Sequence, residues 1–307
     1  MMDENFSDLS SQVIQLDDKA NDFMPSYLRI DNLGNIYILG NSRRDSKQKP
    51  KTKSYQMLVY YSVTTGLKIH DIGLEQGDNF GIKFELVNGI PYAAGLNKNE
   101  KEVRYFVSTI DIQTGAERKL TNKRMPENFY KTANIGGYET DHWRIADIVG
   151  LKNGNIVASV EATVTQERGF FSYNAFLISI TPTGEEKFKV MISKNQGGML
   201  EFVGHALLAS GNKTFFIYND HSDNIKLAPD SKDVKGYLMN DSMVAVLEID
   251  ADGRTIKYPF SKDPAFTDYS ISVADLVKLK DNLYFSSTNK RKSIINIVNR
   301  NVIIEFE

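Results

Sequence analysis

The chain has 307 residues, of which 41% are hydrophobic and 25% are charged, so it is long and apolar enough to bury a sizeable core. A formal net charge of -2 provides no field that would attract nucleic acid or an anionic membrane, and no nucleic-acid partner is expected. The lack of cysteine excludes disulfides, thiolate metal sites and cysteine nucleophiles. No apolar run approaches the roughly 20 residues that cross a bilayer, so no membrane span is expected.

The N-terminal segment begins with polar and acidic residues and lacks the basic and apolar regions of a secretory signal. Residues 1–22 are interpreted as an N-terminal extension, in which 12–16 (QVIQL) resembles a strand that could pair with the last sheet and close a ring. A periplasmic or extracellular location is favoured if a signal peptide preceded Met1 and was removed.

A hairpin pattern then recurs five times along the chain. Each copy is a β-branched and aromatic strand, a tight turn and a second such strand, and the turns hold glycine, asparagine or aspartate, which reach positive φ or cap their own backbone. The copies begin at Tyr27, Ile82, Ile145, Val203 and Val273. Their turns are Gly34-Asn35, Asn88-Gly89, Gly154-Asn155, Gly211-Asn212 and Asp281-Asn282.

A second hairpin follows each of these copies. The second hairpins begin at Met57, Tyr105, Ala175, Met243 and Ser293, and four of them turn on Gly66, Gly115, Gly184 or Gly253. Each unit therefore supplies four antiparallel strands, and the pattern predicts an all-β fold, a β-propeller of about five four-stranded blades in a single domain over 1–307. Six blades, or stacked β-sandwiches, are the alternatives.

The segment RIDNLGNIYILGN from Arg29, and the later Ile-Asp steps at Ile110-Asp111 and Ile249-Asp250, resemble the short repeats of bacterial β-propeller proteins. Many proteins of that kind are extracytoplasmic and lack a characterised function. The resemblance implies an architecture and transfers no catalytic residue to this chain.

Three segments depart from the repeat and are expected to be loops on one face of the propeller: 43–53, 121–141 and 219–241. The second of these enters the third blade through a polar and aromatic cluster. Its Tyr138, Asp141, His142 and Trp143 could converge on a ligand where first strands line a central channel. The competing interpretation is a loop packed by its own aromatic side chains.

The segment 218–224 (YNDHSDN) offers a second candidate site. Asp220 and His221 head a row of oxygen and imidazole groups that could hold a hard cation, but the glycine and distal glutamate of an EF-hand are missing. Such residues also cluster wherever a strand gives way to a turn. The similar run from Asp250 to Gly253 falls on a hairpin turn of the repeat, and no metal site is predicted.

The basic loop offers a third candidate site, in which Arg43 and Arg44 could clamp a carboxylate or phosphate. A solvated loop that keeps a sheet edge soluble is the alternative interpretation. The loop has no interleaved aromatic residues, which disfavours single-stranded nucleic acid.

The linear motifs of serine hydrolases, zinc proteases and nucleotide-binding enzymes are absent, so the leading hypothesis is a non-enzymatic binding or scaffolding propeller. It would present its loop-rich face to a protein, peptide or carbohydrate, as a monomer and without a cofactor. One alternative is a hydrolase or lyase near His142, with His142 or His205 working beside Asp141, Glu139 or Asp147. The other is a structural module of a cell-surface assembly.

Overall fold

A computed structural model describes residues 23–44, 53–72, 78–98, 102–126, 143–166, 169–198, 202–237, 241–261, 269–273, 276–280, 283–291 and 297–305. Within these residues the chain is built from β-strands, with one short 3-10 helix, η4 (Ser222–Lys226). Among the described residues, no helix is long and apolar enough to cross a membrane.

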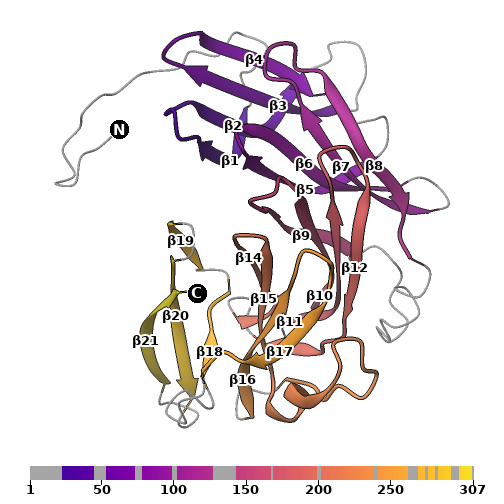
Figure 1. Ribbon diagram of the computed structural model, residues 1–307, viewed down its shortest axis with the longest axis vertical. Coiled ribbons are helices and arrows are strands. Elements are labelled where there is room, and N and C mark those ends of the chain that lie inside the picture. Colours follow the sequence, from indigo (N-terminus) through magenta and orange to yellow (C-terminus); the bar gives the residue numbers. More distant parts are fainter. Residues whose placement is uncertain are drawn as a thin grey trace. The chain divides into compact units, whose positions relative to one another are not determined.

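The strands of the described residues form five antiparallel sheets, each made from consecutive segments of the chain (Figure 1). The first contains β1 (Met24–Ile30), β2 (Ile36–Arg44), β3 (Lys53–Ser62) and β4 (Gly66–Ile72). The second contains β5 (Asp78–Val87), β6 (Ile90–Lys98), β7 (Val103–Ile110) and β8 (Glu117–Arg124). The third contains β9 (Trp143–Gly150), β10 (Ile156–Gln166), β11 (Gly169–Ile180), β12 (Glu186–Ile192) and the short β13 (Gln196–Gly198).

The fourth sheet contains β14 (Ala206–Ser210), β15 (Lys213–His221), β16 (Ser242–Ile249) and β17 (Thr255–Pro259). The fifth contains β18 (Ser270–Ile271), β19 (Val277–Lys280), β20 (Leu283–Arg291) and β21 (Ile297–Glu305). In the first four sheets the strand order follows the chain, which is the topology of a propeller blade. The expected all-β fold of about five four-stranded blades is therefore confirmed.

The fifth sheet corrects one detail of the repeat. The segment from Ser293 was expected to form a hairpin, but β21 is one strand that pairs with β20 over its whole length, from Leu283 opposite Glu305 to Arg291 opposite Ile297. This segment has no glycine to reverse the chain. The sheet instead gains its fourth strand because β18 and β19 both pair with β20.

The hairpin turns have the chemistry that the sequence indicated. Asn88 (φ 53°) and Gly89 (φ 76°) both adopt positive φ, as a two-residue type I′ turn requires. Asp250 Oδ1 accepts the backbone N–H groups of Asp252 and Arg254, both at 2.9 Å, so this aspartate caps a turn, as the repeat predicted.

The chain divides into two compact units, residues 1–76 with 110–117, and residues 77–109 with 118–307. In the first unit, a small apolar cluster on the first sheet is built around Met57 and Val59. There the His70 ring also lies 3.0 Å, through Nε2, from the carbonyl oxygen of Ile112.

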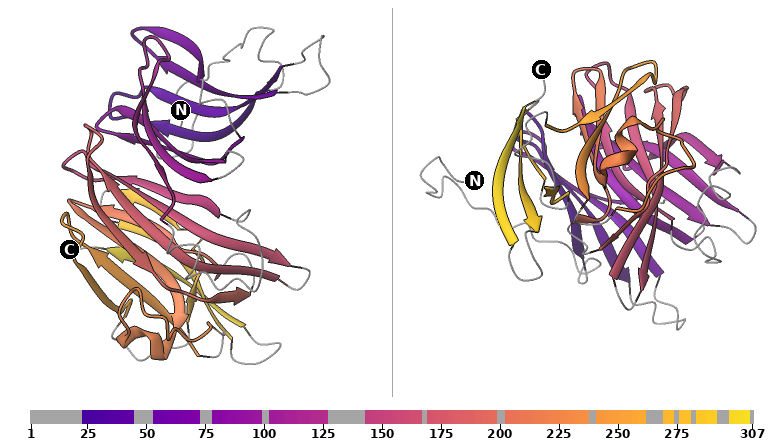
Figure 2. Two further views of the ribbon diagram at one scale, coloured as in Figure 1. Left: turned by 90° about the vertical axis from the view of Figure 1, so that its right-hand side faces the viewer. Right: turned by 90° about the horizontal axis from the view of Figure 1, so that it is seen from below.

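The sheets of the second unit follow one another along the chain (Figures 1 and 2). Three apolar clusters join successive sheets of this unit. The cluster of Trp143, Ile145 and Ile148 with Tyr105 joins the second and third sheets, and a cluster that includes Leu177 and Phe216 joins the third and fourth. A third cluster joins the fourth and fifth. The first strand of the third sheet, β9, also lies against the first strands of the second and fourth sheets, β5 and β14.

The expected loops are shorter than the sequence indicated, because ladder pairing continues into them. Residues 121–124 belong to β8, and 219–221 belong to β15, where Asn219 pairs with Val244. Arg43 and Arg44 extend β2, and Arg44 pairs with Lys53 of β3.

Candidate functional site

The predicted cluster ahead of the third sheet is described only in part. Tyr138, Glu139, Asp141 and His142 lie outside the described residues. Trp143 begins β9 and is 4% exposed, within the apolar cluster that joins the second and third sheets.

The second predicted site is occupied by internal bonds. Asp220 is 3% exposed, and its carboxylate accepts from Lys257 Nζ (2.9 Å) and Asn224 Nδ2 (2.7 Å). His221 is the N-cap of η4, because its Nδ1 accepts the backbone N–H of Asp223 at 3.1 Å. These two residues thus hold the start of the loop to the fourth sheet.

Within the described part of the chain, the structure supports neither the proposed cation site at 218–224 nor the proposed anion clamp of Arg43 and Arg44. Among the described residues there is no group of three or more histidine, aspartate or glutamate side chains arranged to hold a metal ion. Arg43 and Arg44 lie at the end of β2, so they belong to a hairpin ladder.

A β-bulge on β9 sets the direction of its polar side chains. Ile145 pairs with Val160 and Asp147 pairs with Ser159, so Ala146 is the extra residue. Since a shift of one residue reverses every later side chain, Asp147 joins Arg144 on one face, while Ile148 joins the apolar face of Trp143 and Ile145. Bulges commonly re-aim side chains at active sites.

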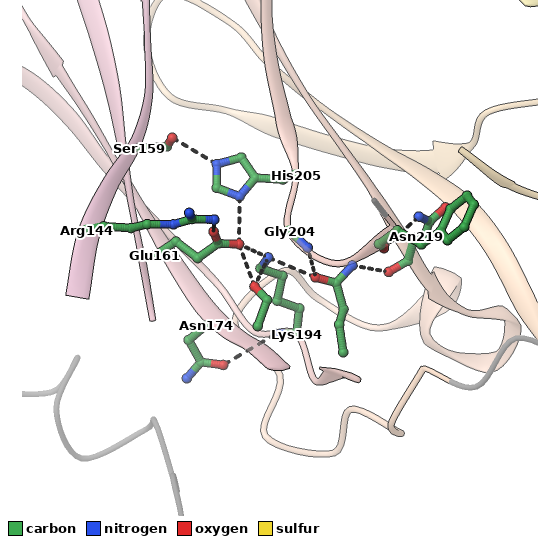
Figure 3. Close-up of polar contacts among 11 residues, drawn as sticks. Arg144, Ser159, Glu161, Asn174, Lys194, Gly204, His205 and Asn219 are labelled. Atoms are coloured by element: carbon green, nitrogen blue, oxygen red, sulfur yellow. Dashed lines mark hydrogen bonds and ion pairs between the residues drawn. The ribbon is translucent and has the colours of Figure 1, made fainter. Parts of the chain in front are cut away.

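On β10 the same face carries Ser159 and Glu161, both 0% exposed. The Glu161 carboxylate is surrounded by donors from four different segments (Figure 3). Its Oε2 is 3.2 Å from Arg144 Nη2, and its Oε1 is 3.1 Å from His205 Nδ1 and also bonds Lys194 and Ser172.

Electrostatics keep Glu161 ionised inside the protein. Burial by itself raises the pKa of this carboxyl, but the Lys194 ammonium, His205 and Arg144 together hold it well below its usual range. Lys194 is equally buried, and burial lowers its pKa against the pull of Glu161. Its three ammonium hydrogens have three acceptors, Glu161, Ser172 Oγ (2.6 Å) and Gln196 Oε1 (3.0 Å).

His205 is neutral and has one tautomer. Burial lowers its pKa to about 4, although the adjacent Glu161 carboxylate raises it. Because an ionised carboxylate can only accept, Nδ1 carries the proton, and Nε2 accepts from Ser159 Oγ at 2.8 Å. The ring also stacks on Phe216, with centroids 4.1 Å apart.

The contacts run from Glu161 through His205 to Ser159, which is the acid, histidine and serine order of a catalytic triad. The Ser159 hydroxyl is completely buried, however, so no substrate carbonyl can reach it. We therefore interpret Ser159 as the donor that fixes the imidazole. The three residues Glu161, His205 and Ser159 then act as a rigid support rather than as a nucleophilic site.

The support continues into the next two sheets. Gln196 donates to the backbone carbonyl of Asn219 (2.6 Å) on β15 and accepts from the backbone N–H of Gly204 (3.0 Å). The Asn219 side chain in turn bonds both the N–H and the carbonyl of Ile271 on β18, each at 2.8 Å. A fully bonded polar chain thus links the third, fourth and fifth sheets.

Asp147 lies beside this support, opposite Ser159 in the ladder, and like His205 it is intermediate in exposure as a whole residue. Its carboxylate accepts the backbone N–H of Ile148 (2.8 Å) and, weakly, that of Leu207 (3.4 Å). Burial raises its pKa to about 6, against these hydrogen bonds and the nearby Lys83, and Glu85 raises it further. Lys83 and Glu85 lie on β5, so charged groups of two neighbouring first strands meet here.

Sequence reasoning named His205 and Asp147 as possible acid and base residues but missed Glu161 and Lys194. The available signal was a lone glutamate in an otherwise apolar and small-residue run, IVASVEATV, where a buried charge requires partners. Lys194 gave no signal, since it lies between β12 and β13 and meets Glu161 only through the fold.

No protein-family model matches the chain, and no curated protein matches its sequence. Solved structures do resemble it. The α-L-arabinofuranosidase from Lactobacillus brevis is 11% identical, with 92% of this chain and 90% of that chain covered and a TM-score of 0.39. The GH62 α-L-arabinofuranosidase catalytic domain of Coprinopsis cinerea is 10% identical, with 92% and 89% covered and a TM-score of 0.41. The Penicillium chrysogenum α-L-arabinanase complexed with arabinobiose is 12% identical, with 73% and 62% covered and a TM-score of 0.39.

These structures correct the leading functional hypothesis. They bear the names of glycoside hydrolases, which contradicts the leading hypothesis of a non-enzymatic binding or scaffolding role and agrees better with the hydrolase alternative. Likeness at TM-scores of 0.39 and 0.41 assigns no residue and no substrate to this chain. Its chemistry has to come from its own side chains.

Proposed function

We propose that this chain is a hydrolase that cleaves a glycosidic bond, with Asp147 as the proton donor. The observation that carries the proposal is the environment of this carboxyl: the bulge on β9 re-aims it, and burial raises its pKa to about 6. A carboxylic acid that keeps its proton near neutral pH can protonate the leaving oxygen of a sugar.

Glycoside hydrolysis commonly uses two carboxyl groups with different protonation states. Glu85 on the neighbouring strand β5 is close enough to Asp147 to raise its pKa, which makes it the second carboxylate of the proposed pair. Behind the pair, Ser159 lies opposite Asp147 in the ladder and bonds His205, which Glu161 holds in turn. Preorganised geometry of this kind favours the transition state.

The first test is turnover. The purified protein is incubated with nitrophenyl glycosides and with arabinan and arabino-oligosaccharides, and the released sugars are measured. Asp147→Asn and Glu85→Gln are compared with Asp252→Asn, a matched change on an exposed turn. We expect the first two variants to lose at least about 100-fold in rate and the control to keep it. No release from any substrate, or full activity in Asp147→Asn, would refute the proposal.

The pH profile gives an independent check. A proton donor with a pKa of about 6 loses its proton as the pH rises, so kcat/KM should fall above about pH 6. A profile that stays flat to about pH 8 would remove Asp147 from the donor role.

A further inference from the structure

Among the groups in direct contact with Glu161, the charges do not cancel. One buried carboxylate faces two cations, Lys194 and Arg144, while His205 is held neutral. The charge of Lys194 by itself neutralises that of Glu161. Lys194 is as deeply buried, and its ammonium group donates all three hydrogens to acceptors inside the protein. Arg144 is thus a surplus positive charge at the edge of the network.

Arg144 is also the one member of this group that reaches solvent. Its side chain is 48% exposed, whereas those of Glu161, Lys194 and His205 are 0% exposed. Within the described part of the chain its one polar partner is Glu161, reached through Nη2 (Figure 3). A guanidinium has five N–H donors, so most of them remain for a ligand.

The base of this side chain is held in place by β5. Gly81 (φ +61°) brings the backbone so close that a Cβ there would lie 3.2 Å from the backbone nitrogen of Ile145 and 3.3 Å from Cβ of Arg144. Glu161 fixes one edge of the guanidinium and β5 packs against its stem. A side chain fixed at both ends loses little entropy when it binds a ligand.

We infer that Arg144 is a specificity residue that binds the carboxylate of an acidic sugar, so that the substrate of this site is a uronic-acid-containing glycan. A planar guanidinium with free donors matches a carboxylate through two parallel hydrogen bonds. The inference rests on the proposed glycosidase function, because Arg144 and Asp147 project from the same face of β9.

The test measures binding rather than turnover. Oligogalacturonate and oligoglucuronate are titrated by calorimetry, each beside its neutral methyl ester, and a sulfated oligosaccharide serves as a third anion. We expect the wild-type protein to bind one of the free acids at least about tenfold more tightly than its ester. Arg144→Gln should abolish this preference and Arg144→Lys should retain part of it, whereas Arg254→Gln, whose side chain is 81% exposed on a turn, should leave it intact.

Several results would overturn the inference. They are equal affinity for acid and ester in the wild-type protein, an acid preference that survives in folded Arg144→Gln, tight binding of the sulfated sugar alone, or no binding to any probe at millimolar concentration. Measuring the acid preference in Asp147→Asn separates the binding role of Arg144 from the catalytic role of Asp147. An acid preference without turnover in the wild type would defeat the hydrolase and keep the binding site, and turnover without an acid preference would do the reverse.

Discussion

Glu161 shows at the scale of one residue why a buried charge needs all of its partners. Its carboxylate accepts from Arg144, Lys194, His205 and Ser172, with no exposure to water. Such a network is stable when it is complete and costly when one member is removed.

We expect Glu161→Gln to lower the free energy of unfolding by about 3–5 kcal/mol, because it leaves the Lys194 ammonium buried without an anion. Urea denaturation measures the loss. The double variant Glu161→Gln with Lys194→Met should recover part of it, since it removes the stranded cation. A loss below about 1 kcal/mol in the single variant would contradict the ion pair.

His205 gives the stability of the protein a pH dependence. Its pKa in the folded protein is about 4, below the ordinary value of 6.5. Between these two pH values the unfolded chain therefore binds a proton at His205 that the folded protein does not bind. Stability from this group is therefore complete above about pH 6.5 and falls as the pH drops toward 4. Asp147 acts in the opposite direction over part of this range, so the two must be separated by a variant.

We expect His205→Gln to unfold with a shallower loss of stability than the wild type between about pH 6.5 and 4. Thermal melting at a series of pH values tests this, with His221→Gln as the control because His221 lies at η4, apart from the Glu161 network. Parallel curves for the wild type and His205→Gln would show that the imidazole is not held neutral.

At the scale of the element, turns and bulges decide what the strands present. The turn glycines differ in their surroundings although the repeat makes them look alike. Gly34 (φ +77°) has nothing within 4 Å of an added Cβ, whereas a Cβ on Gly184 (φ +94°) would lie 2.4 Å from the backbone oxygen of Leu120.

We expect Gly34→Ala to cost about 1 kcal/mol, from positive φ alone. Gly184→Ala should cost at least about 1 kcal/mol more, because the methyl group also presses on a neighbouring strand. The two variants are compared by their midpoints of chemical unfolding. Equal losses would mean that the turn of Gly184 is free to move away from β8.

The bulge at Ala146 is the element that sequence patterning could not supply. Strict alternation along β9 would place Asp147 on the face of Ile145, away from Arg144. Nothing in the local residue types marks an extra residue in the ladder, because the bulge depends on how β9 pairs with β10. The candidate acid was thus visible in the sequence, but its direction was not.

At the scale of the whole molecule, the second unit is held by apolar layers between successive sheets. Phe216 is central to one layer, with 0% exposure, an edge contact with Tyr218 at 5.3 Å and a stacked contact with His205. It therefore joins the packing of the third and fourth sheets to the polar support of the site.

We expect Phe216→Ala to cost about 3–5 kcal/mol and to reduce glycoside turnover as well, because His205 loses the ring that holds it. Phe215→Ala is the matched control, since Phe215 is also buried but faces the layer toward the fifth sheet. Similar stability losses with a selective loss of turnover in Phe216→Ala are the expected outcome. An unchanged rate of glycoside turnover in both variants would show that packing around Phe216 does not support the site.

The sequence by itself determined the architecture, because strand alternation and glycine, asparagine and aspartate turns are local properties that repeat along the chain. It also limited the histidine chemistry to four residues and identified His205 and Asp147 among the candidates. Only the tertiary structure joined Glu161 to Lys194, Arg144 and His205, since these lie on separate segments that meet through sheet packing. A buried charge is stable only where such partners converge, and no linear pattern records that convergence.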